Sequence, residues 1–389
     1  MMFFILGSHP ELSKAEIESV LGHSCNPPQK DVLFVDDPAL NLSSLQQQLA
    51  GTIKVGHIIG EADSYIEKNA AELIATLASG AAGKNKISFG ISIYDIGAEK
   101  KKQSIAHSRD ELGKEVKKIL KETGRPVRYV SSKDADLSSV IVEENELLAS
   151  GGEYCLFIDK DKIYIGQTEG VQDFKAWSTR DFGRPARDSK SGMLPPKLAR
   201  MMINLSGVQM SQTLLDPFCG SGTILMEADL LGIEHIIGSD ISPKAIADTK
   251  KNFEWLENFY DVNKTIVENL YVSDAALLDT RFTEPVNTIV AETYLGAPRT
   301  KPATEKELQK TTQDLFQIYE SCFQTLRKLI TKDGTAVIAF PAFVMTDGSV
   351  HHLDLNSFLK RTGWTITDTF LYKRDNQFVG RDIVRMRPS

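Results

Sequence analysis

Two aspartates and two glycines in the second half of the chain have the types and spacing of a ligand-binding turn. Asp216 follows an apolar run, and Gly220 and Gly222 form a tight turn before a stretch with helical spacing of its apolar residues. Glycine lets a backbone approach a ligand that a Cβ would exclude. Asp240 ends the next apolar run, where a carboxylate commonly accepts ribose hydroxyls, or alternatively caps the helix that follows.

The elements around these residues must form a doubly wound α/β sheet to bring them together. Apolar runs separated by helical stretches predict parallel strands whose carboxyl ends meet at one edge. The expected strands end at residues 215, 240, 272, 291 and 340, and an antiparallel pair follows at 365–373 and 377–386. A helix is expected to start near Pro195, because proline early in a helix fixes φ without losing a hydrogen bond.

The string DPFCGSGT at 216–223 resembles the first motif of S-adenosylmethionine-dependent methyltransferases that modify amino groups on nucleic-acid bases. The resemblance implies S-adenosylmethionine as the cofactor, with its methionine part wrapped by the turn from Gly220 to Gly222 and with Phe218 as a further cofactor-binding residue. The strings RPARD, LPPKLARMMINL and DPFCGSG also follow in the order found in tRNA guanine-N2-methyltransferases with an N-terminal THUMP domain. There the proline-started helix lies beside the cofactor pocket, which places Pro195 near the cofactor, although a plain packing helix is the alternative.

The resemblance also assigns the residues after the third and fourth strands. Asp274 and Ala275 correspond to the position where the family holds the adenine ring, with a carboxylate for the exocyclic amine and a backbone amide beside it. After the fourth strand, amino methyltransferases carry Asp/Asn-Pro-Pro-Tyr/Phe, which binds the target amine and stacks on the flipped-out base. This chain has Glu292 in the acid position and Tyr294 one residue earlier than the expected aromatic.

This departure from the motif bears on activity. The protein mainly orients the amine and stabilises positive charge as it develops, so Glu292 could accept the hydrogen bond and Tyr294 could stack. A lost contact of this kind costs roughly 3 kcal/mol, about a hundredfold in rate. A protein that binds RNA and cofactor without turnover is therefore the alternative.

The N-terminal half is expected to contain two further domains. Residues 1–62 alternate strands and helices as a small α+β domain of ferredoxin-like type. Residues 63–170 resemble a THUMP domain, an RNA-binding module, through FGISIY, a basic helix, VRYVSS and LSSVIVEENEL. Strands are expected at 87–94, 127–130, 140–148, 154–158 and 162–166. Residues 171–191 are predicted as a linker and 192–389 as the methyltransferase domain.

A basic patch marks the THUMP-like segment. Between residues 84 and 133 there are 13 lysines and arginines against 6 acidic residues, in a chain of net charge −7. Such a patch can neutralise phosphates and dock a folded RNA by shape, although a solvated helix face is the alternative. The residues predicted to bind RNA are Lys100, Lys101, Lys102, Arg109, Lys117, Arg128 and Lys133.

Composition also limits which kinds of metal site, disulfide framework and membrane segment the chain could contain. The chain of 389 residues has four cysteines without a CxxC pair, which argues against a zinc site or a disulfide framework and fits a reducing cytoplasm. The apolar start is too short for a signal or membrane helix. His351 and His352 lack a third ligand nearby in sequence, so we expect no metal.

These features together predict a methyltransferase that modifies an exocyclic amine of an RNA base, with guanine N2 in tRNA as the target implied by the resemblance. Ribosomal RNA or DNA amino methylation, including adenine N6, is the alternative within enzymes. A nicotinamide enzyme would need a GxGxxG turn, which DPFCGSG does not supply. We expect a monomer, with a surface that would permit a small activating protein.

Overall fold

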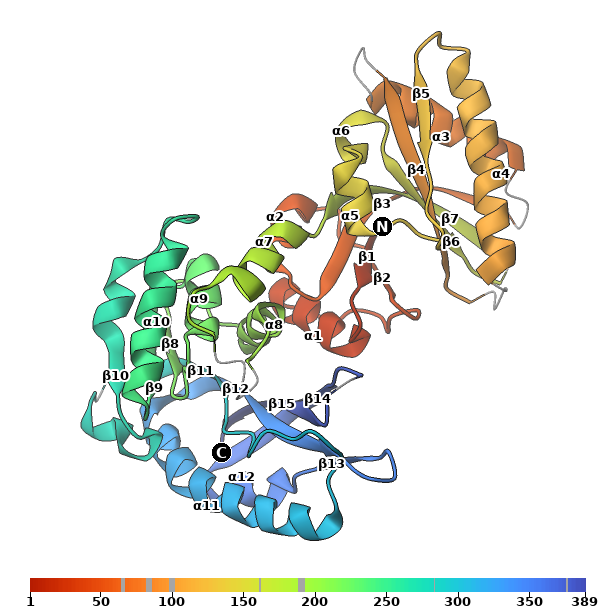
Figure 1. Cartoon of the computed structure of the whole chain (residues 1–389). Coiled ribbons are helices and arrows are strands. Elements are labelled where there is room, and N and C mark those ends of the chain that lie inside the picture. The colour runs from red at the N-terminus through yellow and green to blue at the C-terminus, as the bar shows by residue number, and fades with distance from the viewer. Residues whose placement is uncertain are drawn as a thin grey trace. The chain divides into compact units, whose positions relative to one another are not determined.

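The computed structural model describes residues 1–63, 67–81, 86–97, 102–160, 162–187, 193–282, 284–375 and 377–389. The chain divides into two compact units. Unit 1 comprises residues 1–14 and 23–175, and unit 2 comprises residues 15–22 and 176–389. Each unit has its own sheet (Figure 1).

Unit 1 is built on one seven-stranded sheet with the order β2-β1-β3-β7-β6-β4-β5. The β4–β5 and β4–β6 pairs are parallel and the others antiparallel. The strands are β1 (Met2–Leu6), β2 (Val32–Val35), β3 (Thr52–Asp63), β4 (Ile87–Asp95), β5 (Val127–Val130), β6 (Glu153–Ile158) and β7 (Lys162–Val171). The helices from this part of the chain are α1 (Pro10–Leu21), α2 (Leu42–Gln48), α3 (Glu67–Ala81), α4 (Lys102–Lys121), α5 (Ser139–Glu144), α6 (Leu147–Ser150) and α7 (Phe174–Ser178).

The sheet of unit 1 runs through both of the domains predicted for the N-terminal half. β3 pairs with β7 along most of its length, so strands from either side of residue 62 share one ladder. Buried apolar residues of α3, α4, β4 and β6 form the main core of the unit. The structure therefore groups residues of the two predicted segments into one compact body.

The strand predicted at residues 140–148 is wrong, because this stretch forms the short helices α5 and α6. Ser138 caps α5 by accepting a hydrogen bond from the backbone N–H of Ile141 at 3.3 Å. Val142 and Leu147 are buried in a small apolar cluster with Val130 and Leu137. Tertiary packing and the serine cap therefore override the strand preference of the β-branched residues.

Unit 2 has a second sheet with the order β10-β9-β8-β11-β12-β15-β14, and β13 pairs with β12. The first five strands are parallel, and β15 runs antiparallel to both of its neighbours. The strands are β8 (Thr213–Asp216), β9 (His235–Asp240), β10 (Leu270–Val272), β11 (Val286–Glu292), β12 (Ile330–Val344), β13 (Val350–His352), β14 (Trp364–Tyr372) and β15 (Val379–Pro388). This order confirms the predicted doubly wound α/β domain.

The helices of unit 2 lie between these strands in sequence. They are α8 (Pro196–Ser206), α9 (Thr223–Leu230), α10 (Pro243–Leu256), α11 (Glu305–Leu329) and α12 (Leu355–Arg361). A π-helical turn at Thr179–Gly183 and 3₁₀ turns at Lys264–Asn269 and Ala275–Thr280 complete the unit. Part of the predicted linker is thus helical, and its residues 188–191 lie outside the described part of the chain.

Candidate active site

A pocket of about 860 Å³ lies at the carboxyl ends of the parallel strands of unit 2. The chain order reverses between β8 and β11, and ligands of doubly wound sheets bind at such a reversal. The predicted site residues that line it are Asp216, Phe218, Gly220, Asp240, Asp274, Ala275, Glu292 and Tyr294. The fold thus brings together residues that are up to 78 positions apart in sequence.

The two glycines of the turn have different roles. Gly220 lines the pocket with φ +53°, and a Cβ added there would meet nothing within 4 Å, so its open side is available to a ligand. Gly222 also has a positive φ, +85°, but a Cβ there would lie 2.7 Å from the Thr249 side chain. Gly222 is therefore needed for backbone conformation and for packing against α10, whereas the predicted close approach to a ligand applies to Gly220.

The carboxylates of Asp216 and Asp240 fix the turn. Asp216 is buried and its Oδ1 accepts from the backbone N–H of Phe218 at 3.1 Å. Burial raises the pKa of Asp216 well above its usual range, and the nearby carboxylates of Asp240 and Glu292 raise it further. Asp240 accepts from the N–H of Gly220 at 3.0 Å through Oδ2 and from Ser242 at 2.9 Å through Oδ1.

The alternative role of Asp240 as a helix cap is not observed. Ser242 is the N-cap of α10, and its side chain accepts from the backbone N–H of Ala245. Asp240 instead joins the end of β9 to the glycine turn while it lines the pocket. Its position is that expected of a ribose-binding carboxylate.

The other predicted cofactor residues lie on or near the pocket wall. Asp274 accepts from the backbone N–H of Ala276 at 2.9 Å and lines the pocket together with Ala275. Pro195 is buried as the N-cap of α8, as predicted for the start of that helix, but it does not line the pocket. Met193 and Leu194, which precede it, do.

Glu292 is held by an arginine that comes from the last strand of the sheet. The Nε of Arg381 donates to Oε1 of Glu292 at 2.5 Å, and Arg381 is 4 % exposed. Burial raises the pKa of Glu292, and the Arg381 guanidinium opposes this rise. Within the described part of the chain, Glu292 accepts from Arg381 through Oε1, and its Oε2 remains to accept a hydrogen bond from a substrate.

The backbone after Glu292 is fixed by side chains instead of the prolines of the family motif. The hydroxyl of buried Tyr319, from α11, donates to the carbonyl of Tyr294 at 2.5 Å. The hydroxyl of Thr293 lies 3.1 Å from Tyr319 Oη and 3.0 Å from the carbonyl oxygen of Ala339. The Tyr294 ring is 53 % exposed and lines the pocket, so it is accessible to a planar substrate.

The pocket is strongly acidic. Five acidic residues line it, against the single lysine Lys244. The acidic residues are Asp216, Asp240, Asp248, Asp274 and Glu292. Clustered carboxylates favour a cationic ligand, because a positive charge relieves their mutual repulsion.

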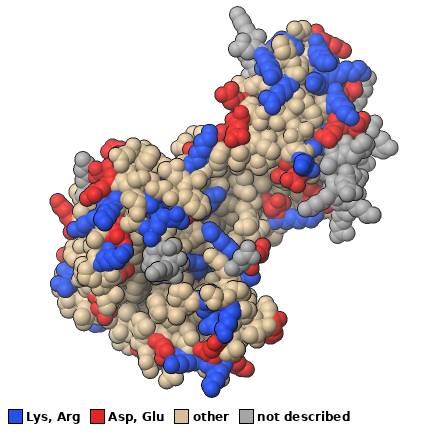
Figure 2. Space-filling model, viewed as in Figure 1, with Lys and Arg blue, Asp and Glu red and all other residues tan. Residues whose placement is uncertain are grey.

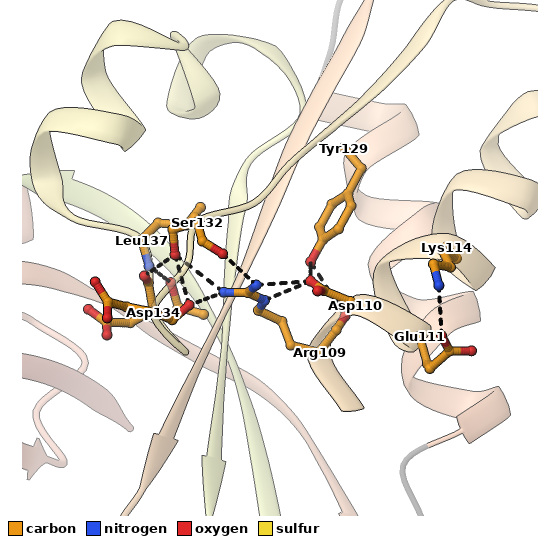
Figure 3. Close-up of polar contacts among 10 residues, drawn as sticks. Arg109, Asp110, Glu111, Lys114, Tyr129, Ser132, Asp134 and Leu137 are labelled. Carbon is orange, nitrogen blue, oxygen red and sulfur yellow. Dashed lines mark hydrogen bonds and ion pairs between the residues drawn. The ribbon is translucent and has the colours of Figure 1, made fainter. Parts of the chain in front are cut away.

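Arg109, predicted to bind RNA, is instead a buried structural residue. It is 1 % exposed and donates to the carbonyl oxygens of Ser132 and Asp134 and to the carboxylate of Asp110 (Figure 3). These bonds join α4 to the segment after β5. The prediction for Arg109 is wrong because a count of basic residues does not distinguish surface charges from buried ones.

The rest of the predicted patch differs from residue to residue. Arg128 and Lys133 are exposed and Lys117 is half-buried. Lys114 and Lys118 pair with Glu111 and Glu115 one helical turn earlier, which weakens the local positive field. Figure 2 shows Lys and Arg side chains gathered where α4 and β5 lie in Figure 1.

Some predicted RNA-binding residues lie beyond what the structure describes. Lys100 and Lys101 fall outside the described residues, and the side chain of Lys102 does as well. Among the described residues no cluster of side chains could hold a metal ion, and none of the helices there is long and apolar enough to cross a membrane. The four cysteines are free thiols.

Known methyltransferases are similar to this chain in sequence or in fold. Residues 184–347 match the RMKL-like methyltransferase domain family, and residues 98–251 match a DNA methylase model. The chain is 24 % identical over 364 residues to a tRNA (guanine(10)-N2)-dimethyltransferase of Methanothermobacter thermautotrophicus, covering 92 % of this chain and 91 % of that protein. Its fold is similar to that of TrmN from Thermus thermophilus, with a TM-score of 0.56 at 14 % identity over both full chains. A putative methyltransferase complexed with SAH has a TM-score of 0.51 at 14 % identity, covering 100 % of this chain and 98 % of the other.

Proposed function

We propose that this chain transfers a methyl group from S-adenosylmethionine to an exocyclic amine of an RNA base, namely N2 of a guanine in tRNA. The observation that carries the proposal is the meeting of Glu292 and Tyr294 with the Gly220 turn and Asp240 in one acidic pocket. The similarity to tRNA guanine-N2 methyltransferases along most of the chain supports the choice of substrate.

The residues of the pocket fit the cofactor. Gly220 would leave room for the methionine part, because a Cβ there would meet nothing within 4 Å, and Asp240, which lines the pocket, would accept the ribose hydroxyls. Asp274 and Ala275 lie where the adenine ring would bind. When bound, S-adenosylmethionine supplies an electrophilic methyl group on a positively charged sulfur, and the acidic lining is suited to that charge.

The residues at the end of β11 would act on the target base. Oε2 of Glu292 accepts a hydrogen bond from the amine, aims its lone pair and stabilises the positive charge that develops on nitrogen. A bound cofactor would supply the methyl carbon to that nitrogen, and Glu292 would accept the proton that the nitrogen then releases. The exposed ring of Tyr294 stacks on the flipped-out base.

We propose that unit 1 binds the RNA through exposed basic residues around α4 and β5. Arg128 and Lys133 are exposed and Lys117 is partly so, and such residues neutralise phosphates without selecting bases.

We also propose that residues 63–170 form a THUMP-like domain and residues 1–62 a ferredoxin-like domain. A cytoplasmic location is proposed as well, and the free thiols support it. A monomer that accepts a small activating protein is likewise proposed.

The test is transfer of labelled methyl groups to unmodified tRNA, ribosomal RNA and duplex DNA in parallel, followed by nucleoside analysis. Label in N2-methylguanosine of tRNA alone is the expected result. Label in DNA alone, in line with the DNA methylase match, would retain the chemistry and refute the substrate. No label with intact cofactor binding would favour an RNA-binding protein without turnover.

A further inference from the structure

Arg381 reaches the active site across an intervening strand. Glu292 on β11 is opposite Ala339 on β12, and Arg381 on β15 is opposite Pro341, two residues further along β12. These residues share one face of the sheet, because side chains two positions apart on a strand point the same way. The ion pair therefore joins β11 to β15 over small residues of β12.

Without Arg381, the surroundings of Glu292 would disfavour the ionised form of its carboxyl group. Its side chain is half-buried, 17 % exposed, and lies near the buried carboxyl of Asp216, from β8, and the hydroxyl of Tyr319, from α11. Desolvation raises the pKa of Glu292 and so favours its protonated form, and a protonated carboxyl accepts hydrogen bonds poorly. Arg381 supplies a cation in direct contact with this group.

We propose that Arg381 is a positioning residue that keeps Glu292 ionised and fixes Oε1, so that Oε2 faces the target amine. The role given to Oε2 rests on the proposed function, whereas the effect of Arg381 on the ionisation of Glu292 does not depend on it. Arg381 touches neither cofactor nor base in this scheme, and it acts through Glu292 alone.

The distance to be spanned explains a glutamate where the family motif has aspartate or asparagine. Neighbouring strands lie about 4.8 Å apart, so the backbones of β11 and β15 are separated by about 10 Å with β12 between them. Two long side chains can meet across this distance at 2.5 Å. An aspartate at position 292 would be shorter by one methylene and would lose the contact, so Glu292→Asp should not substitute for Glu292.

The experiment compares the wild-type chain with Arg381→Gln, Arg381→Lys and Arg385→Gln. Arg385 is the matched control, because it lies on the same strand and face but pairs with Asp368 at 3.9 Å. The first readout is the pH titration of the Glu292 side chain by ¹³C NMR, with its signal assigned from Glu292→Gln. The second is the pH profile of kcat/KM for tRNA methylation, with cofactor affinity measured separately.

Arg381→Gln should move the titration of Glu292 and the acidic limb of the pH profile to higher pH. The sign follows because the ionised form is active and Arg381 lowers the pKa, so activity is lost at a higher pH as the solution is acidified. We expect kcat/KM to fall about a hundredfold with unchanged cofactor affinity. Arg381→Lys should restore part of the rate and Arg385→Gln should change neither readout.

An unchanged Glu292 titration in Arg381→Gln would overturn the inference, as would the same shift in Arg385→Gln. If the wild-type chain is inactive but Arg381→Gln shows the expected shift in the Glu292 titration, the proposed function is refuted. The role of Arg381 in keeping Glu292 ionised is then still established. An active wild type with an unchanged profile in Arg381→Gln would refute the positioning role alone.

Discussion

Deletion of a single buried hydroxyl should test whether the loop after β11 is held by Tyr319. In Tyr319→Phe the ring remains in the core, and the bond of 2.5 Å to the carbonyl of Tyr294 is lost together with the contact to Thr293. A buried hydrogen bond contributes about 1 kcal/mol net, and an unpaired partner adds to the loss. We therefore expect the free energy of unfolding to fall by about 2 kcal/mol.

The same change should slow methyl transfer more than it affects cofactor binding. Tyr319 does not line the pocket, so the dissociation constant for S-adenosylmethionine should stay within about twofold of wild type. Release of the Tyr294 carbonyl should let the loop shift by a fraction of an ångström, which should lower the single-turnover rate roughly tenfold. Calorimetry, fluorescence titration and single-turnover methylation measure the three quantities.

Tyr154→Phe is the matched control for this experiment. Tyr154 is also fully buried, but its hydroxyl finds no hydrogen-bond partner among the described residues. Removing it should leave stability unchanged or raise it, because an unsatisfied buried hydroxyl is unfavourable. Equal melting temperatures and equal rates for Tyr319→Phe and wild type would refute the argument that this hydroxyl holds the loop.

Three further substitutions separate catalysis, cofactor binding and RNA binding. Glu292→Gln keeps the shape but removes the charge, so the single-turnover rate should fall about a hundredfold while the cofactor dissociation constant, measured by calorimetry, is unchanged. Asp240→Ala removes the ribose acceptor and leaves the N–H of Gly220 without this partner, so cofactor affinity should fall at least tenfold, and equal affinity would contradict the ribose assignment. Lys133→Gln should reduce the slope of log K for tRNA against log salt by about 1. Arg109→Gln should lower the melting temperature and leave that slope unchanged, and the opposite result would restore Arg109 to the RNA-binding surface.

The cofactor side of the site was predictable because it depends on short stretches of sequence. The strand β8, the Gly220 turn and the acid at the end of β9 lie between residues 213 and 240, and the periodicity of the apolar residues indicates where each strand ends. The start of α11 depends on sequence just as local, because Thr304 with Glu307 forms a capping box at its first turn. Local capping and periodicity are visible in one sequence.

Arg381 and Tyr319 were not predicted, because their roles depend on long-range arrangement. Arg381 contacts Glu292 only because the last strand is inserted between β12 and β14, and no local pattern around position 381 reveals this order. Tyr319 has the helical spacing of a core residue, and only the fold shows that its hydroxyl meets the active-site loop. The prediction that Arg109 binds RNA was wrong for a related reason, since the burial of a side chain depends on neighbours distant in sequence.

The pairing of β3 with β7 has a consequence for the order in which unit 1 can form during synthesis. The edge of β3 that pairs with β7 stays open until residue 171 has left the ribosome, although β1 to β3 are complete more than a hundred residues earlier. Closing so long a loop is entropically slow, and open strand edges invite pairing with other chains. Nascent chains that end at residue 160 should therefore be digested rapidly by protease, whereas chains that extend past residue 175 should resist it; equal resistance would show that the first strands fold without β7.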